Sequence, residues 1–173
     1  MKHTKLMGLR SLFALVAAIG FAGISDVSGA TSGNVGLAGE VPLILDIVVN
    51  AEPGASSMSP SSVVSELAIA NVWEYCNDAD GYTVSVSSAN AVADGANSGV
   101  LTGAVDSEDL AYSLTYGGAS VGFVNGSAQV TDATGKTDAN GDAKSIDIAF
   151  DGSTSNLAAD SYQDTLTFTI AAK

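Results

Sequence analysis

Residue types that commonly carry out catalysis are scarce in this chain. Its only histidine is His3 and its only arginine is Arg10, so the chain beyond them has no Ser-His or Cys-His pair and no guanidinium group to clamp an anion. Carboxylates are plentiful, and a pair of them could in principle hydrolyse a glycosidic bond. Most of them lie in stretches rich in Gly, Ser and Asn, where acids are usually solvated turn residues. We therefore expect a protein that is not an enzyme and needs no cofactor.

A single cysteine, Cys76, has no second cysteine with which to form an internal disulfide. Two interpretations of it stay open. The thiol packs inside the fold as a small hydrophobic group, as free cysteines often do, or it bonds to another chain. Trp73 and Tyr75 stand beside it, and core packing is a simpler interpretation of these rings than a platform for sugars.

One loop carries alternating oxygen ligands of the kind that bind calcium. Asp138, Asn140 and Asp142 lie within the stretch DANGD. An EF-hand loop needs glycine at its sixth position and glutamate at its twelfth, and Ala143 and Ala149 occupy those positions here. The three residues remain weak candidates for a looser metal site, and a solvated loop is the simpler interpretation.

The first thirty residues have the layout of a secretory signal peptide. Basic residues at 2, 5 and 10 precede an apolar run at 11–24, and small residues at 28–30 follow. We therefore predict a signal peptide at 1–30 and a secreted protein. No later stretch is apolar enough to span a bilayer, so we expect no membrane insertion.

The chain that would remain after cleavage is strongly acidic. It keeps 18 of the 19 acids, because only Asp26 is lost, and three lysines, Lys136, Lys144 and Lys173, so its net charge is 3 − 18 = −15. A chain with this charge repels phosphate backbones and anionic lipid surfaces. We expect no nucleic-acid partner.

Apolar residues recur at every second position in several stretches, which is the period of half-buried β-strands. Frequent turn signals separate these stretches, which predicts an all-β, immunoglobulin-like antiparallel β-sandwich of about eight strands. The predicted apolar faces are Tyr82, Val84 and Val86; Leu110, Tyr112, Leu114 and Tyr116; Ile146, Ile148 and Phe150; and Tyr162, Leu166, Phe168 and Ile170.

Three local features refine this prediction. Residues 61–72 read as extended rather than helical, and residues 88–99 read as a loop of small residues. Asn125-Gly126 predicts a tight type I′ hairpin turn. Tyr162 suits a corner position at which its hydroxyl group bonds a nearby backbone group.

The alternation over residues 35–49 is too long for one strand, since it would span about 50 Å. Pro42 marks the predicted joint between two extended segments, because proline cannot donate to a ladder. We therefore expect an N-terminal extension at 31–42 and a sandwich domain at 43–173.

Four stretches together resemble the spore coat protein U family, which is related to chaperone–usher pilins. The ending NLAADSYQDTLTFTI carries most of the resemblance, and VPLILDIVVNA, CNDADGYTVSVSSANA and LAYSLTY follow the family's order. This chain departs from the family in one respect. The family has a cysteine shortly after its first strand, bridged to a second one, whereas the stretch NAEPGASS has none.

The resemblance implies an incomplete sandwich whose groove, beside the final strand, accepts the N-terminal extension of a neighbouring subunit. The donated residues would be Val35, Leu37, Gly39 and Val41, and the accepting residues would be Tyr162, Leu166, Phe168 and Ile170. It further implies identical or related subunits as partners, a periplasmic chaperone and an outer-membrane usher, passage through the periplasm, and a surface fibre or coat used in adhesion or biofilm.

Two alternatives remain open at this point. The N-terminal run could fold back into its own sheet and give a closed monomer, since its periodicity fits both arrangements. The protein would then be a monomeric exported module that binds a glycan or calcium.

Overall fold

A computed structural model describes residues 31–173, and the predicted signal peptide, residues 1–30, lies outside the described residues. The strands are β1 (Leu45–Ala51), β2 (Val63–Cys76), β3 (Tyr82–Ser88), β4 (Gly99–Gly103), β5 (Asp109–Tyr116), β6 (Ala119–Val121), β7 (Ser127–Ala133), β8 (Asp142–Asp151), β9 (Tyr162–Gln163) and β10 (Leu166–Ala172). A short 3-10 helix, η1 (Pro53–Ser56), follows β1, and one α-helix, α1 (Ala89–Asp94), follows β3.

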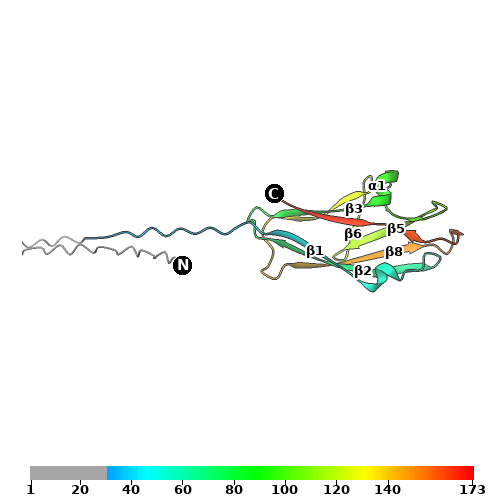
Figure 1. The fold of residues 1–173 in the computed structure, drawn as a ribbon, viewed down its shortest axis with the longest axis horizontal. Helices are drawn as coiled ribbons and strands as arrows, with labels where there is room; N and C mark the ends of the chain where they lie inside the picture. Colours follow the sequence, from blue (N-terminus) through cyan, green and yellow to red (C-terminus); the bar gives the residue numbers. More distant parts are fainter. Residues whose placement is uncertain (1–30) are drawn as a thin grey trace, which may run out of the picture. The chain divides into compact units, whose positions relative to one another are not determined.

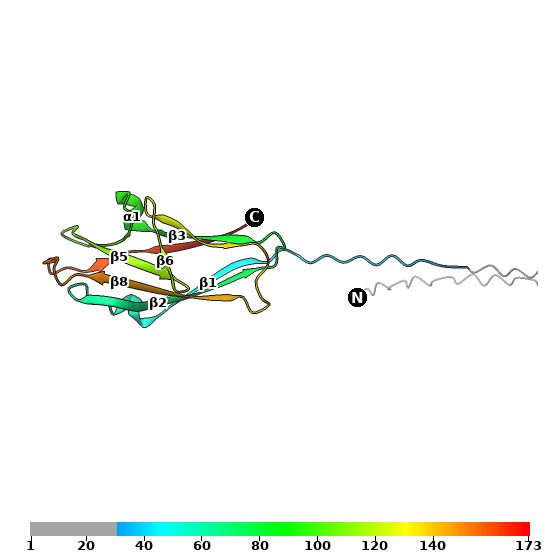
Figure 2. The same ribbon diagram turned by 180° about the vertical axis from the view of Figure 1, so that it is seen from behind.

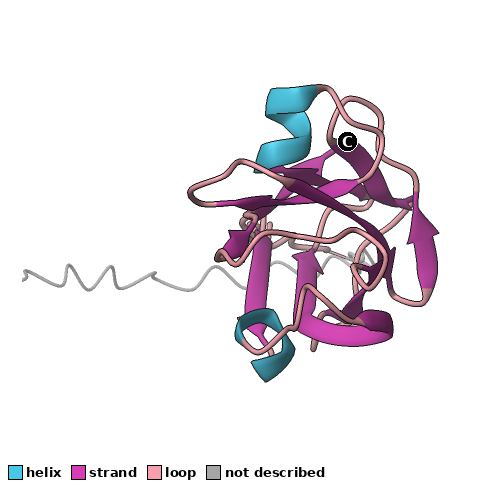
Figure 3. Cartoon of the chain, turned by 90° about the vertical axis from the view of Figure 1, so that its right-hand side faces the viewer, coloured by secondary structure: helices cyan, strands magenta, loops and turns pink. Residues whose placement is uncertain are grey.

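The strands form two antiparallel sheets that pack face to face (Figures 1 and 2). The larger sheet has seven strands in the order β1-β2-β8-β5-β4-β9, with β6 added beside β5. The smaller sheet has three strands in the order β10-β3-β7. Figure 3 shows the two layers of strands, with the helices outside them. The predicted all-β antiparallel sandwich is confirmed, with ten strands in the described range where about eight were expected.

The predicted apolar faces of the central strands form the core. Val84 of β3, Leu114 of β5 and Ile146 of β8 are completely buried. The extended conformation predicted for residues 61–72 is also correct, since they fall largely within β2.

A carboxyl group is buried inside this apolar core. Glu74 of β2 is fully buried and accepts three hydroxyl hydrogen bonds, at 2.8 Å from Tyr82, 2.5 Å from Tyr116 and 2.7 Å from Thr131. Tyr82 and Thr131 belong to the small sheet, whereas Glu74 and Tyr116 belong to the large one. The cluster therefore joins the two sheets by hydrogen bonds, and these satisfy a polar group whose burial would otherwise be costly.

The loop predicted at residues 88–99 is wrong in its first half, where helix α1 forms. Ser88 caps this helix by accepting a hydrogen bond from the backbone N–H of Ala91 at 3.1 Å, and Gly95 ends it with φ 66°. Both are ordinary helix-end signals. The intervening alanines favour a helix, but six residues are too few to show a helical period.

The predicted turn at Asn125-Gly126 is confirmed, with φ angles of 49° and 76°, which a type I′ turn requires. Val124 and Ser127 exchange two backbone hydrogen bonds across it. However, the pairing ends after this one bridge, because β6 joins the large sheet while β7 joins the small one. The turn therefore directs the chain from one sheet to the other.

Replacing Glu74 tests the hydrogen-bonded cluster. We expect Glu74→Ala to lower the free energy of unfolding by about 3 kcal/mol, because three buried hydroxyl groups lose their acceptor. Urea unfolding followed by circular dichroism measures this. Glu66→Ala, at an exposed position of the same strand, is the matched control. A loss for Glu74→Ala no larger than for Glu66→Ala would show that the cluster contributes nothing.

Burial raises the pKa of Tyr82, Tyr112 and Tyr116 above the usual value, and neighbouring carboxylates raise it further. Because these pKa values are higher in the folded than in the unfolded state, the stability that they contribute is fully present below about pH 10 and is lost as the pH rises above it. We expect tyrosinate absorbance from these residues to develop only together with unfolding seen by circular dichroism. Gradual ionisation of all five tyrosines in a chain that stays folded would contradict this.

Candidate assembly groove

The final strand has one unpaired edge. β10 pairs only with β3, and β1 pairs only with β2, although β1 and β10 approach each other from opposite sheets. Each therefore presents a row of backbone N–H and C=O groups without a ladder partner in the described chain. Such an edge is a template for another strand.

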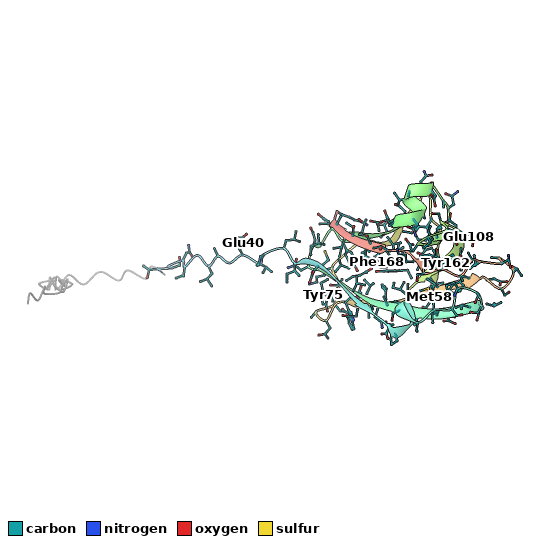
Figure 4. All side chains as sticks on the ribbon, turned by 45° about the vertical axis from the view of Figure 1, so that its right-hand side comes forward. Glu40, Met58, Tyr75, Glu108, Tyr162 and Phe168 are labelled. Atoms are coloured by element: carbon teal, nitrogen blue, oxygen red, sulfur yellow. The ribbon has the colours of Figure 1, made fainter. Side chains whose placement is uncertain are left out.

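An apolar cavity of about 210 Å³ lies between these two strands. It is lined mostly by apolar side chains from β1, η1 and the segment after it, β2, β4, β5, β8 and β10. Its lining residues include Val49, Met58, Leu101, Tyr112, Leu166 and Phe168. Figure 4 labels Met58 and Phe168, two of these residues. The cavity continues into a more polar hollow of about 360 Å³ that shares Met58, Leu101 and Asp164 and extends to Tyr162. We call the two together the groove.

Apolar side chains along the groove are incompletely buried. Leu166, Phe168 and Ile170 pack on the core but are only half-buried, and Val49 of β1 is 47% exposed. Phe168 contacts the core through Tyr116, with ring centroids 6.0 Å apart. Further apolar side chains placed along this edge would remove exposed hydrophobic surface from water, at about 25 cal/mol per Å².

The prediction that Tyr162, Leu166, Phe168 and Ile170 form one face of a single strand is wrong. Tyr162 lies in β9, which pairs with β4 of the large sheet, whereas Leu166, Phe168 and Ile170 lie in β10 of the small sheet. The chain changes sheets at Asp164 and Thr165. Three of the four predicted accepting residues, Tyr162, Leu166 and Phe168, therefore line the groove, although they do not share a strand. Ile170 lies farther along β10 and lines neither cavity.

Asp164 holds this crossing point in place. Its carboxylate accepts hydrogen bonds from the hydroxyl groups of Ser88 and Tyr112, both at 2.6 Å, and from the backbone N–H groups of Asn90 at 3.2 Å and Thr165 at 2.7 Å. Hydrogen bonds to a carboxylate are the stronger kind. They tie the last segment to both sheets and to the start of α1. Asp164 was missed in the sequence, although an acid in the apolar register between Tyr162 and Leu166 signals a special position.

Tyr112 reaches Asp164 because its strand partner is a glycine. Gly99 lies directly opposite Tyr112 in the β4–β5 ladder. Any side chain at residue 99 would collide with the Tyr112 ring. Burial raises the pKa of Tyr112, and the hydrogen bond to Asp164 raises it further, so the hydroxyl group remains a donor.

The corner role predicted for Tyr162 is confirmed. Its hydroxyl group lies 3.3 Å from the carbonyl oxygen of Ala158 and 3.0 Å from Oε2 of Glu108. Glu108 also accepts from the backbone N–H of Ala158 at 2.7 Å. Figure 4 shows Tyr162 and Glu108 together at one end of the sandwich, with Tyr75 at the other.

The carboxylate of Asp160 holds the chain in place at the end of the groove near Tyr162 and Glu108. Asp160 accepts hydrogen bonds from the backbone N–H groups of Val105 at 2.6 Å, Asp106 at 3.1 Å and Ser161 at 2.6 Å. The bond from Val105 is the largest cause that lowers the pKa of Asp160. This end of the groove therefore carries a fixed negative charge at neutral pH.

The predicted donor residues lie in a segment, residues 31–44, that forms no helix or strand. Val35, Leu37 and Val41 are 85%, 93% and 82% exposed. Gly39 lies between them, and no heavy atom lies near the position that its Cβ would take. Apolar side chains at alternate positions of an exposed segment often mark a surface that binds a partner.

The calcium candidates lie in and beside one turn. Among residues 31–173, no three His, Cys, Asp or Glu side chains are grouped so that they could hold a metal ion. Asp138 and Asn140 lie in a turn closed by the bond from Gly141 N–H to the Asp138 carbonyl at 2.9 Å. Asp142 begins β8, with a carboxylate oxygen 3.4 Å from the Tyr82 hydroxyl. Cys76 is 3% exposed, which agrees with the interpretation of a buried thiol.

A scan against protein-family models found no match for this chain, and a search of curated proteins found none either. Within residues 31–173, no helix has the length and hydrophobicity needed to cross a membrane.

Asp164 is open to a direct test. We expect Asp164→Ala to lower the free energy of unfolding by about 3 kcal/mol, because it removes an acceptor of several hydrogen bonds at once. Chemical unfolding measures this. Asp151→Ala is the matched control, since the Asp151 carboxylate bonds only to Ser153 in its local turn. Equal losses in the two variants would refute the special position of Asp164.

Proposed function

We propose that this protein is a secreted, non-enzymatic structural subunit of a surface fibre or coat. In this proposal, residues 35–41 of one copy enter the groove of the next and pair with the open edge of β10. The observation that carries it is the apolar groove between β1 and β10, which runs beside an unpaired strand edge. Strand addition to such an edge combines backbone hydrogen bonds with alternate side chains that fill pockets.

The extension supplies what the groove needs. Val35, Leu37 and Val41 would point inward at every second position, with Gly39 where little space is available. Both surfaces are exposed in the single chain, and each would be an aggregation risk if it stayed uncovered. Because the donated and accepting surfaces differ, the contact is head-to-tail and continues into a fibre.

The resemblance to spore coat protein U and the chaperone–usher pilins adds the proposed cellular route. A periplasmic chaperone would cover the groove before assembly, and an outer-membrane usher would join the subunits. Identical or related subunits are then the partners, and adhesion or biofilm formation is the proposed use.

Two complementary variants of residues 31–173 test the proposal. Leu37→Asp disables the extension, and Phe168→Asp disables the groove, so we expect each variant to stay monomeric. Mixed together, they should form a one-to-one dimer, because the extension of the Phe168→Asp copy can still enter the intact groove of the Leu37→Asp copy. Size-exclusion chromatography with light scattering measures this, and negative-stain electron microscopy should show fibres of the unaltered chain.

Two matched controls place the same charge on the outward faces. Ala38→Asp and Thr167→Asp are neighbours of the disabling positions but point the other way in an alternating strand. They should leave assembly largely intact. An unaltered chain that stays strictly monomeric would refute the proposal and favour the monomeric glycan- or calcium-binding module.

A further inference from the structure

The direction in which a strand would enter the groove follows from the registers of β1 and β10. Leu45, at the start of β1, pairs with Cys76, and Ala172, at the end of β10, pairs with Tyr82. Cys76 and Tyr82 flank one short turn, so β1 begins where β10 ends (Figure 1). We call this the Cys76 end and the opposite end, where β10 begins, the acidic end. A strand that adds antiparallel to β10, the slightly more stable pairing, brings its own C-terminal residues to the acidic end.

The acidic end has no compensating cation. Its carboxylates are Asp106, Glu108 and Asp160, in the loops whose hydrogen bonds are described above, with Asp109 at the start of β5 and Asp151 at the end of β8. All three lysines of the described range lie at the Cys76 end. Lys136 precedes Thr137, which bonds Cys76, Lys144 contacts Gly117, and Lys173 bonds Gly81 through its backbone and Asp132 through its side chain.

The incoming segment brings another negative charge to this place. Glu40, which is exposed (Figure 4), is the only charged residue of the segment 31–44. In the antiparallel arrangement it would arrive beside Asp160 and Asp164. The link between two joined copies would also be short. The Asn77 side chain donates a hydrogen bond to the Pro42 carbonyl and accepts one from the Ile44 N–H, and so it holds these residues to the Cys76 end of their own sandwich.

We propose, on the basis of the strand-addition function above, that dissolved cations control the joining of two copies by screening the repulsion between Glu40 and the acidic end of the groove. The apolar groove supplies the attraction between the two copies. The repulsion between like charges at the acidic end of the groove sets the rate at which they join. Screening by the ionic atmosphere suffices, and no bound ion is involved. The Debye length falls from about 30 Å at 0.01 M salt to about 3 Å at 1 M, so the repulsion disappears within this range.

The mixed pair of variants, Leu37→Asp as acceptor and Phe168→Asp as donor, gives a single joining step whose rate can be measured by stopped-flow light scattering or energy transfer between labels. We expect the rate to rise roughly tenfold between 0.01 M and 1 M sodium chloride. Sodium chloride is preferred to sulfate, because sulfate also strengthens hydrophobic burial. Because screening depends on ionic strength, magnesium chloride at equal ionic strength should raise the joining rate no more than sodium chloride does.

Changing Glu40 in the donor copy makes the test local. At low salt, Glu40→Gln should join faster than the unaltered donor, and Glu40→Lys faster still and with a weaker dependence on salt. Glu66→Lys in the same donor changes the net charge equally but lies on β2, away from the joint, so its effect should be clearly smaller. The amplitude of joining at high salt should be the same for all four donors.

The outcomes separate the two proposals. No joining at any salt concentration would defeat strand addition itself. A joining rate that depends neither on the salt concentration nor on residue 40 would be consistent with strand addition but would overturn the electrostatic control. A slower rate for Glu40→Lys would also overturn it, because residue 40 would then meet positive rather than negative charge at the contact.

Discussion

The hydrogen bonds to Asp164 are the constraint on which the open edge of this sandwich, along β10, depends. They hold the chain at the point where it leaves the large sheet after β9 and enters the small sheet as β10. Because the carboxylate is bonded to Tyr112 of one sheet and Ser88 of the other, the crossing cannot shift along either sheet without breaking strong bonds. β10 therefore stays fixed along β3 with its second edge free. The groove is a consequence of this fixed crossing rather than of loose packing.

A second polar cluster supports the same architecture from inside. Glu74, with its three hydroxyl partners, joins the two sheets at the Cys76 end, while Asp164 joins them near the acidic end. Two fully bonded carboxylates at separate places hold the sheets in one relative position, which nondirectional apolar contacts alone would specify less sharply. This matters because the small sheet has only three strands and covers the large one incompletely. The uncovered part is the apolar cavity beside Leu166 and Phe168.

Charge and hydrophobicity act in opposite directions at the proposed contact. The groove exposes apolar surface that attracts further apolar side chains, whereas residues 31–173 carry a net charge of −15 (three lysines against 18 acids), which repels other copies of the chain. Hydrophobic attraction acts at contact, and charge repulsion acts over a Debye length. In the proposed assembly, the salt concentration would therefore decide whether separate copies stay dispersed or join. The three lysines of the described range all lie at the Cys76 end, so the two ends of the sandwich differ in their balance of charge.

The sequence by itself determined the class of fold and most of its core. Alternation with period two is a local consequence of the pleat, so the buried faces of β3, β5 and β8 and the turn at Asn125-Gly126 could be predicted from neighbouring residues. Only the tertiary structure decided which sheet each strand joins. Tyr162 and Phe168 share one unbroken pattern, yet they lie in different sheets, because the bonds that divide them come from Ser88 and Tyr112, residues distant in sequence. Edges and grooves depend on which strands pair, and periodicity within one strand carries no information about its neighbours.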